Sequence, residues 1–114
     1  MKSVLIIIGD MFLGEDIAEI LKIEGFNVNK ERHLKNLSVI RKFLPDFILI
    51  DSDYPGINVT DVINYLKSDK STKNILPIFI VPPQNNYIKA LIKKDGGLIL
   101  EKPFDINDLL KVIK

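Results

Sequence analysis

The chain has 114 residues, of which 46% are hydrophobic and 27% are charged. This length and balance fit one globular domain and exclude a disordered or collagen-like chain. Sixteen basic and fifteen acidic residues give a net charge of +1, which argues against direct nucleic-acid binding as the main task. The chain contains no cysteine, so disulfide scaffolds, thiolate metal sites and cysteine nucleophiles are excluded.

Neither a membrane span nor a secretory signal is visible. The longest apolar stretch, Val4–Ile8, is far shorter than the roughly 20 residues that a span needs. It leads directly into a charged amphipathic segment, unlike a signal peptide. We therefore expect a cytoplasmic protein that makes no membrane contact. The single histidine, His33, lies among charged residues, and we interpret it as a solvent-exposed side chain rather than a metal ligand or a catalytic base.

The first half of the chain alternates between apolar segments and segments with helical spacing. Val4–Ile8 predicts a strand, and the apolar spacing from Leu13 to Leu21 predicts a helix. Gly25 marks the end of that helix. Phe26–Val28 predicts a second strand, and the spacing from Leu37 to Leu44 predicts a second helix that ends before a proline.

The second half repeats this alternation three times. The predicted strands are Phe47–Ile50, Ile78–Val81 and Leu98–Leu100. The predicted helices carry apolar stripes at Val59–Leu66, at Ile88–Ile92 and at Ile106–Ile113, the last with Asp105 as its N-cap. The first, third and fourth strands are continuously apolar and rich in isoleucine, as strands buried on both faces should be.

Five strand–helix units in this order predict an α/β fold. Such alternation implies right-handed crossovers and a parallel sheet with helices on both faces. Five units are too few for a closed eight-fold barrel. We therefore predict a five-stranded parallel sheet in a doubly wound (βα)5 three-layer sandwich of the flavodoxin-like or CheY-like kind. Residues 1–114 form a single domain, and Lys114 is either a natural end or a cut from a longer protein.

Polar residues follow the predicted strands at the edge where ligands bind in open α/β sheets. Asp10, Asp51 and Lys102 should meet there. Neighbouring carboxylates repel each other and favour a cation, and a hard ion such as Mg²⁺ suits them. A lysine opposite them would neutralise an incoming phosphoryl group. This set favours attack of a carboxylate on a phosphoryl donor to give an aspartyl phosphate.

The sequence resembles the receiver domains of response regulators in two-component signalling. The resemblance covers nearly the whole chain and rests on the segments VLIIIGD, EILKIEGFNV, PDFILIDSDYPG, ILPIFIV and LILEKPF. It implies a phosphoacceptor domain of a phosphorelay, which regulates a partner or a fused output and is not an enzyme beyond slow self-phosphorylation and self-dephosphorylation. The implied partner is a histidine kinase or a phosphotransfer protein.

The resemblance also assigns roles to individual residues. Asp51 is the implied phosphoacceptor, and Asp10 is the implied direct ligand of Mg²⁺. Asp53 would give its backbone carbonyl to the metal, and Lys102 would contact the phosphoryl group. The bond from Lys102 to Pro103 is often cis in this family.

Four positions depart from the family pattern. Gly9 replaces one acidic residue, which weakens the expected Mg²⁺ site. Pro82 stands where the family carries a threonine or serine, and Pro83 stands where a backbone N–H usually contacts the phosphoryl group. Ile99 replaces an aromatic residue that usually moves with the hydroxyl. The active site is therefore predicted to be degenerate, and propagation of phosphorylation to the face formed by the fourth helix, fifth strand and fifth helix is predicted to be impaired.

Two alternatives follow from these departures and from the fold. The first is a pseudo-receiver that acts without phosphorylation as an interaction or dimerisation module, with a homodimer formed through that same face. The second, more remote, is a flavodoxin-like binder of a nucleotide or flavin. Gly9 and Gly14 have the outer spacing of a phosphate-binding loop, but Glu15 and Asp16 stand where lysine and a hydroxyl residue are needed.

Overall fold

A computed structural model describes residues 2–31 and 36–113 of the chain. Five parallel strands form one sheet in the order β2-β1-β3-β4-β5. The strands are β1 (Ser3–Ile7), β2 (Asn27–Lys30), β3 (Phe47–Asp51), β4 (Leu76–Val81) and β5 (Leu98–Glu101). The helices are α1 (Met11–Ile23), α2 (Ser38–Phe43), α3 (Val59–Lys67), α4 (Asn86–Asp95) and α5 (Ile106–Ile113). His33 lies outside the described residues.

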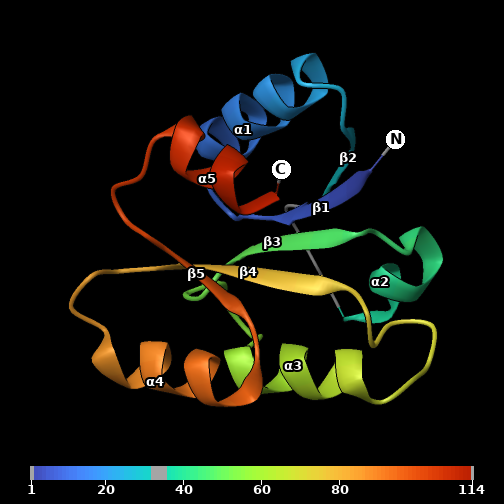
Figure 1. Cartoon of the computed structure of the whole chain (residues 1–114), viewed down its shortest axis with the longest axis vertical. Coiled ribbons are helices and arrows are strands. Elements are labelled where there is room, and N and C mark those ends of the chain that lie inside the picture. Colours follow the sequence, from blue (N-terminus) through green and yellow to red (C-terminus); the bar gives the residue numbers. More distant parts are fainter. Residues whose placement is uncertain (1, 32–35, 114) are drawn as a thin grey trace.

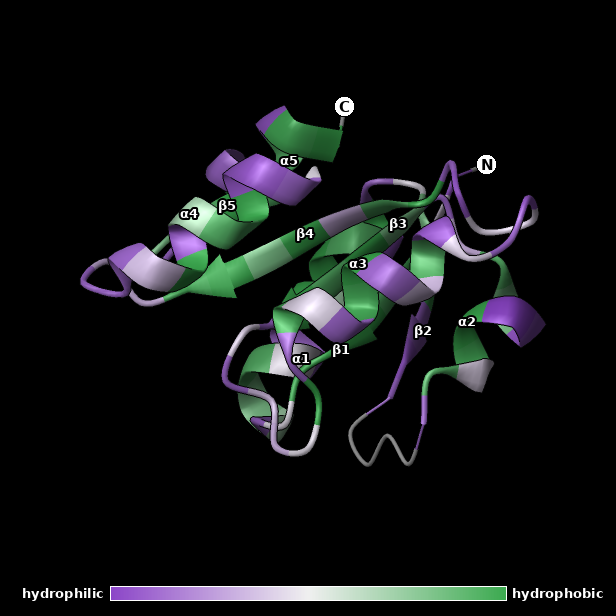
Figure 2. Cartoon of the chain, turned by 90° about the horizontal axis from the view of Figure 1, so that it is seen from below, coloured by the Kyte–Doolittle hydropathy of each residue, from purple (hydrophilic) through white to green (hydrophobic). Residues whose placement is uncertain are grey.

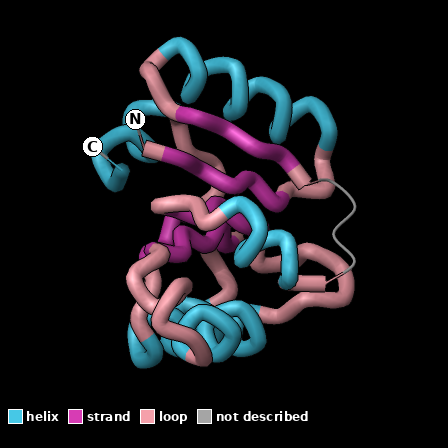
Figure 3. Tube along the Cα trace, turned by 90° about the vertical axis from the view of Figure 1, so that its right-hand side faces the viewer, coloured by secondary structure: helices cyan, strands magenta, loops and turns pink. Residues whose placement is uncertain are grey.

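The sheet lies between two layers of helices (Figures 1 and 3). Helices α1 and α5 cover one face, and α2, α3 and α4 cover the other. Alternate residues along each central strand therefore enter two separate hydrophobic clusters, as the period of two in a strand requires. This arrangement confirms the predicted doubly wound three-layer sandwich.

The central strands are buried on both faces, as their composition predicts. In β4 the five residues from Pro77 to Val81 are all buried. Strand β4 begins two residues before the predicted start because Leu76 pairs with Phe47 of β3. The edge strand β2 differs: it is largely hydrophilic, in contrast to β3 and β4 (Figure 2).

The predicted position of β2 is wrong by one residue at its start and two at its end. Phe26 precedes the strand, which runs from Asn27 to Lys30. The side chain of Phe26 is 9% exposed and joins the cluster beneath α1. Its hydrophobicity thus reflects core packing, whereas the polar residues after it make the strand because they pair with β1 at the sheet edge.

The helix ends follow ordinary capping chemistry. The Asp10 carboxylate accepts a hydrogen bond from the Leu13 backbone N–H at 3.1 Å and caps α1. Gly25 adopts a φ of 94° after the same helix, which glycine tolerates without steric cost. Asp105 and Asp108 exchange two side-chain-to-backbone hydrogen bonds of 3.1 Å, which confirms the predicted cap of α5.

The last residue of the second predicted apolar stripe does not join the core. Leu44 is 51% exposed and takes a left-handed φ of 48° as the C-cap of α2. Helix α2 has six residues, and Ile40 is the one that it buries completely. The chain turns at Leu44 because the following proline disfavours a further helical residue.

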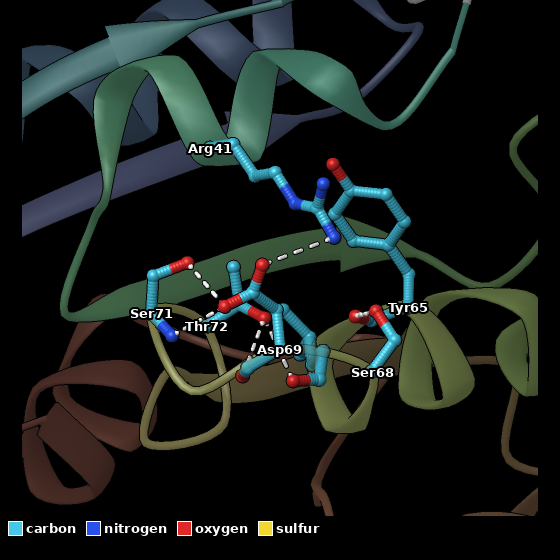
Figure 4. Close-up of polar contacts among 7 residues, drawn as sticks. Arg41, Tyr65, Ser68, Asp69, Ser71 and Thr72 are labelled. Carbon is cyan, nitrogen blue, oxygen red and sulfur yellow. Dashed lines mark hydrogen bonds and ion pairs between the residues drawn. The ribbon is translucent and has the colours of Figure 1, made fainter.

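Three side chains from α2, α3 and the loop before β4 hold α2 in place (Figure 4). The Asp69 carboxylate accepts hydrogen bonds from the backbone N–H of Ser71 at 2.9 Å and from its hydroxyl at 3.1 Å. Arg41 lies 3.4 Å from the other oxygen of Asp69 and 5.1 Å from the ring centre of Tyr65. Beneath them the buried Thr72 hydroxyl donates to the Leu66 carbonyl at 2.8 Å.

These contacts predict an acid-sensitive contribution to stability. The hydrogen bonds from Ser71, and then the charge of Arg41, lower the pKa of Asp69 below its ordinary value of 3.8. A lowered folded-state pKa means that the carboxylate stabilises the fold at neutral pH and loses this effect as the pH falls through the folded-state pKa. Asp69→Asn should therefore lower the free energy of unfolding at pH 7 more than at about pH 2.

Urea unfolding of both proteins at the two pH values measures this difference. Arg41→Met is the companion variant, because it removes the charge of Arg41 and leaves the Ser71 hydrogen bonds to Asp69. It should show a smaller pH-dependent loss than Asp69→Asn. If Asp69→Asn lowered the free energy of unfolding equally at both pH values, the lowered pKa of Asp69 would be contradicted.

Candidate functional site

The predicted site residues gather at the carboxyl edge of the sheet. Asp51 is the last residue of β3, and Lys102 follows β5 directly. The register that pairs Ile7 with Ile50 brings the end of β1, and the loop that carries Asp10, next to the end of β3. The structure brings Asp51 and Lys102 into contact and places Asp10 in the neighbouring loop after β1. The role of Asp10 in the site stays a prediction.

Asp51 and Lys102 form an ion pair across the end of β4. The Lys102 Nζ lies 3.1 Å from Asp51 Oδ2. The Asp51 side chain is 16% exposed and that of Lys102 is 37% exposed, so water screens this pair less than a fully exposed one. The other oxygen, Asp51 Oδ1, accepts a hydrogen bond from the Asp53 backbone N–H at 3.0 Å. Both oxygens of Asp51 are thus oriented by neighbours while one edge of the group stays open to solvent.

Asp10 is exposed at the start of α1. One of its oxygens caps the helix through Leu13, which fixes the direction of the carboxylate. Among the described residues, no three acidic, histidine or cysteine side chains gather as metal ligands. Asp10, which follows β1, and Asp51, which ends β3, are the two carboxylates predicted to bind a cation.

The loop between β4 and α4 forms one wall of a groove beside Lys102. The groove has a volume of about 600 Å³. Its lining residues are Leu13, Pro82, Pro83, Gln84, Lys102, Pro103 and Phe104. The peptide bond between Lys102 and Pro103 is cis. The backbone N–H of Lys102 donates to the Val81 carbonyl at 3.0 Å and joins the ends of β4 and β5.

One polar side chain at this edge was not anticipated from the sequence. Ser52 follows Asp51, and its hydroxyl oxygen is buried without a hydrogen-bond partner among the described residues. Its backbone N–H donates to the Ile80 carbonyl at 2.9 Å. Sequence reasoning could not find this feature, because a serine after a strand is ordinary loop composition.

Comparison with curated proteins connects this geometry to a class of proteins. No family model matches the chain. The chain is 25% identical over 116 residues to the DNA-binding response regulator MtrA of Mycobacterium tuberculosis, which covers 99% of this chain and 49% of MtrA. It is 32% identical over 115 residues to "Probable transcriptional regulator ycf29" of Pyropia yezoensis, covering 97% of this chain and 51% of that protein. The chain spans about half the length of these curated relatives.

Solved structures show the same fold over the whole chain. A response regulator receiver domain protein of Clostridium thermocellum matches with a TM-score of 0.87 at 21% identity, covering 99% of this chain and 91% of that one. The chemotaxis protein CheY4 of Vibrio cholerae matches with a TM-score of 0.86 at 20% identity, covering 99% and 96%. The chain is a response-regulator receiver domain.

The four residues that depart from the family pattern lie in three parts of the receiver domain. Gly9 precedes Asp10, and a Cβ atom built on Gly9 would meet nothing within 4 Å. Pro82 and Pro83 lie directly beyond β4 and line the groove. Ile99 in β5 packs against the cluster on the α4 side of the sheet. These four positions carry no hydroxyl, aromatic or acidic side chain that could serve as a switch.

The residues present fit a weakly held Mg²⁺ ion. Asp10 and Asp51 supply oxygen ligands of the type that Mg²⁺ binds, and waters would fill the remaining positions. Gly9, the residue before Asp10, has no side chain that could add a third carboxylate. These oxygen ligands are therefore of the type that Mg²⁺ prefers, but two carboxylates carry too little negative charge to bind the ion tightly.

The receiver domain contains no phosphate-binding loop at its first glycines. Gly14 lies inside α1 and its Cβ position faces Ile8 at 3.9 Å. Glu15 and Asp16 follow Gly14 in α1, so acidic side chains stand where a phosphate-binding loop carries lysine and a hydroxyl residue. No helix in the described residues is long and apolar enough to cross a membrane.

Proposed function

We propose that Asp51 accepts a phosphoryl group from a histidine kinase or a phosphotransfer protein, in the presence of Mg²⁺. The ion pair of 3.1 Å between Asp51 and Lys102 carries this proposal. The pair brings a carboxylate and a partly exposed ammonium group together at the carboxyl edge of the sheet. The domain would act as an acceptor in the cytoplasm rather than as an enzyme, and would pass the signal to a partner or a fused output.

The transfer requires Lys102 to exchange the Asp51 carboxylate for the incoming phosphoryl group. An oxygen of Asp51 forms a bond to phosphorus while the bond from phosphorus to the donor breaks, and the electron pair of that bond leaves with the donor. Lys102, at 37% exposure, can turn from the carboxylate to the transferred phosphoryl oxygens. The Asp53 N–H continues to orient the carboxyl group. Bound Mg²⁺ supplies charge neutralisation at the phosphoryl oxygens.

An amide NMR titration tests the proposal. Mg²⁺ is added first, followed by beryllofluoride, which stands in for the phosphoryl group. We expect saturable shifts at Asp10, Asp51 and Lys102. Asp51→Asn is the matched control, because asparagine keeps the volume and the bond from Asp53 but loses the charge. Absence of shifts in the unmodified protein at millimolar Mg²⁺ with beryllofluoride would contradict the proposal.

A second candidate function is favoured by the β4–α4 loop. Pro82 and Pro83 have no N–H to give to a phosphoryl group, and each missing charged hydrogen bond is worth about 1.5–3 kcal/mol. The domain would then serve as a pseudo-receiver, with the face of α4, β5 and α5 as its interaction or dimerisation surface. In that case the beryllofluoride titration leaves Ile99 and α4 unshifted, and dimerisation is the same for Asp51→Asn as for the unmodified protein.

A further inference from the structure

The loop between β4 and α4 is held by its carbonyl groups. Pro82 and Pro83 have no backbone N–H, so they can only accept hydrogen bonds. The Pro82 carbonyl accepts from the Asn85 backbone N–H at 3.1 Å, which closes a local turn. The Pro83 carbonyl accepts from the Lys89 Nζ at 2.5 Å. The Pro83 carbonyl is therefore bound by a side chain, that of Lys89, and not by a backbone N–H group.

Lys89 connects three elements through one ammonium group. It lies one turn into α4, and its backbone N–H donates to the Asn85 carbonyl at 3.2 Å. Its Nζ also lies 2.5 Å from Glu101 Oε1 at the end of β5. The contacts of Lys89 with the Pro83 carbonyl and the Glu101 carboxylate are called the Lys89 bridge below. The Lys89 side chain is 18% exposed and that of Glu101 is 51% exposed, so the bridge consists of charge-assisted hydrogen bonds that water partly screens.

The Lys89 bridge and the Asp51–Lys102 pair involve neighbouring residues at the end of β5. Glu101 is the last residue of the strand and contacts Lys89, and Lys102 follows it and contacts Asp51. Figure 1 shows the loop leaving β4 and turning back into α4 at this edge of the molecule. Because Pro82 and Pro83 form one wall of the groove and Lys102 contributes to another, the position of the loop sets the width of the groove beside Lys102.

We propose that Lys89 is a positioning residue that fixes the β4–α4 loop against the end of β5. The bridge holds the loop in one place through a contact that does not involve the Asp51 site. Release of Lys89 lets the loop move away from β5 and widens the groove. The consequence for Asp51 rests on the proposed function. A loop held by Lys89 does not move when Asp51 is phosphorylated, and loss of the bridge allows it to move.

Backbone amide exchange at Asn85 and Asn86 tests the bridge in the whole chain without Mg²⁺ or a phosphoryl mimic. Both N–H groups are hydrogen-bonded within the loop. Lys89→Met keeps the length of the side chain and removes its charge, so exchange at both amides should rise about tenfold. Lys89→Arg should restore slow exchange, because arginine can donate to both partners. Unchanged exchange in Lys89→Met would overturn the proposal.

Two further variants separate the bridge from a general loss of stability. Lys93→Met, on the same helix at an exposed position, should leave exchange at Asn85 and Asn86 unchanged. Glu101→Gln removes one charge without shortening the side chain, and exchange should rise by about threefold. An equal rise in Lys93→Met, or accelerated exchange throughout β4, would show that the effect is not specific to the bridge and would overturn it.

The same proteins distinguish this proposal from the proposed function. If beryllofluoride does not change the amide shifts of the unmodified protein, the proposed function of Asp51 is contradicted. The exchange rates at Asn85 and Asn86 still test the Lys89 bridge, because they are measured without beryllofluoride. If both proposals hold, beryllofluoride shifts remain near Asp51 in the unmodified protein and extend into α4 in Lys89→Met. Shifts that reach α4 equally in both proteins would overturn the restraint that Lys89 is proposed to impose.

Discussion

Replacing Gly9 with aspartate is expected to raise the Mg²⁺ affinity of the receiver domain by about 10- to 100-fold. The proposed Mg²⁺ site has the carboxylates of Asp10 and Asp51 as ligands, and affinity for a hard cation grows with the number of charged oxygen ligands. The space for a third carboxylate already exists, because a Cβ atom on Gly9 meets nothing within 4 Å. The backbone of Gly9 does not have a positive φ, so aspartate can adopt the same conformation without steric strain.

Gly9→Asn is the matched control for this gain. Asparagine has nearly the same volume as aspartate but no charge, so its effect on Mg²⁺ affinity should be small. The measurement is the saturation of amide shifts at Asp10 and Asp51 with increasing Mg²⁺. Combining Gly9→Asp with Asp51→Asn should remove most of the gain, because the charges act on one ion. Equal affinities for Gly9→Asp and Gly9→Asn would place residue 9 outside the metal site.

The Asp51–Lys102 pair could be predicted because sheet topology leaves little freedom. Parallel strands in a doubly wound sheet end at one edge, and a residue directly after a strand has its direction set by the pleat. Asp51 ends β3 and Lys102 follows β5. Their ion pair of 3.1 Å follows from two strand positions that are readable in the sequence.

The Lys89 bridge could not be predicted in the same way. Lys89, Lys93 and Lys94 look alike in the sequence, as basic residues on the polar face of one helix. What distinguishes Lys89 is that the preceding turn brings the Pro83 carbonyl and the end of β5 within reach of its side chain. Such a contact depends on loop conformation, which hydrophobic periodicity does not specify.

Two errors in the predicted elements have a similar origin. Phe26 and Leu44 are both hydrophobic residues at the ends of elements, and the sequence does not tell which side of an element boundary each occupies. Phe26 is buried outside β2, and Leu44 is exposed as the C-cap of α2. Element boundaries are set by backbone hydrogen bonds and caps, so apolar character alone misplaces them by one or two residues.

Truncating Phe79 to alanine is expected to lower the free energy of unfolding by about 3–5 kcal/mol. Phe79 lies in the middle of β4, is 0% exposed and is the largest of the fully buried side chains. The Phe79 ring also leaves little room for a side chain at Gly97, the residue before β5. A Cβ atom on Gly97 would lie 3.1 Å from Phe79 Cε2 and 3.2 Å from Ile92 Cγ2, closer than ordinary van der Waals contact. Removal of the ring therefore leaves a cavity between β4, β5 and α4.

The same contact predicts a non-additive pair of substitutions. Gly97→Ala should destabilise the protein by about 1–3 kcal/mol, because the new methyl group overpacks against the Phe79 ring. The cost should fall in a Phe79→Leu background, where the shorter side chain leaves room for the methyl group. Gly9→Ala, in open space, is the control for adding a methyl group without overpacking. Urea unfolding of the single and double variants measures the coupling. Strictly additive losses would mean that the ring does not confine Gly97, and that the close approach of β5 to β4 has another cause.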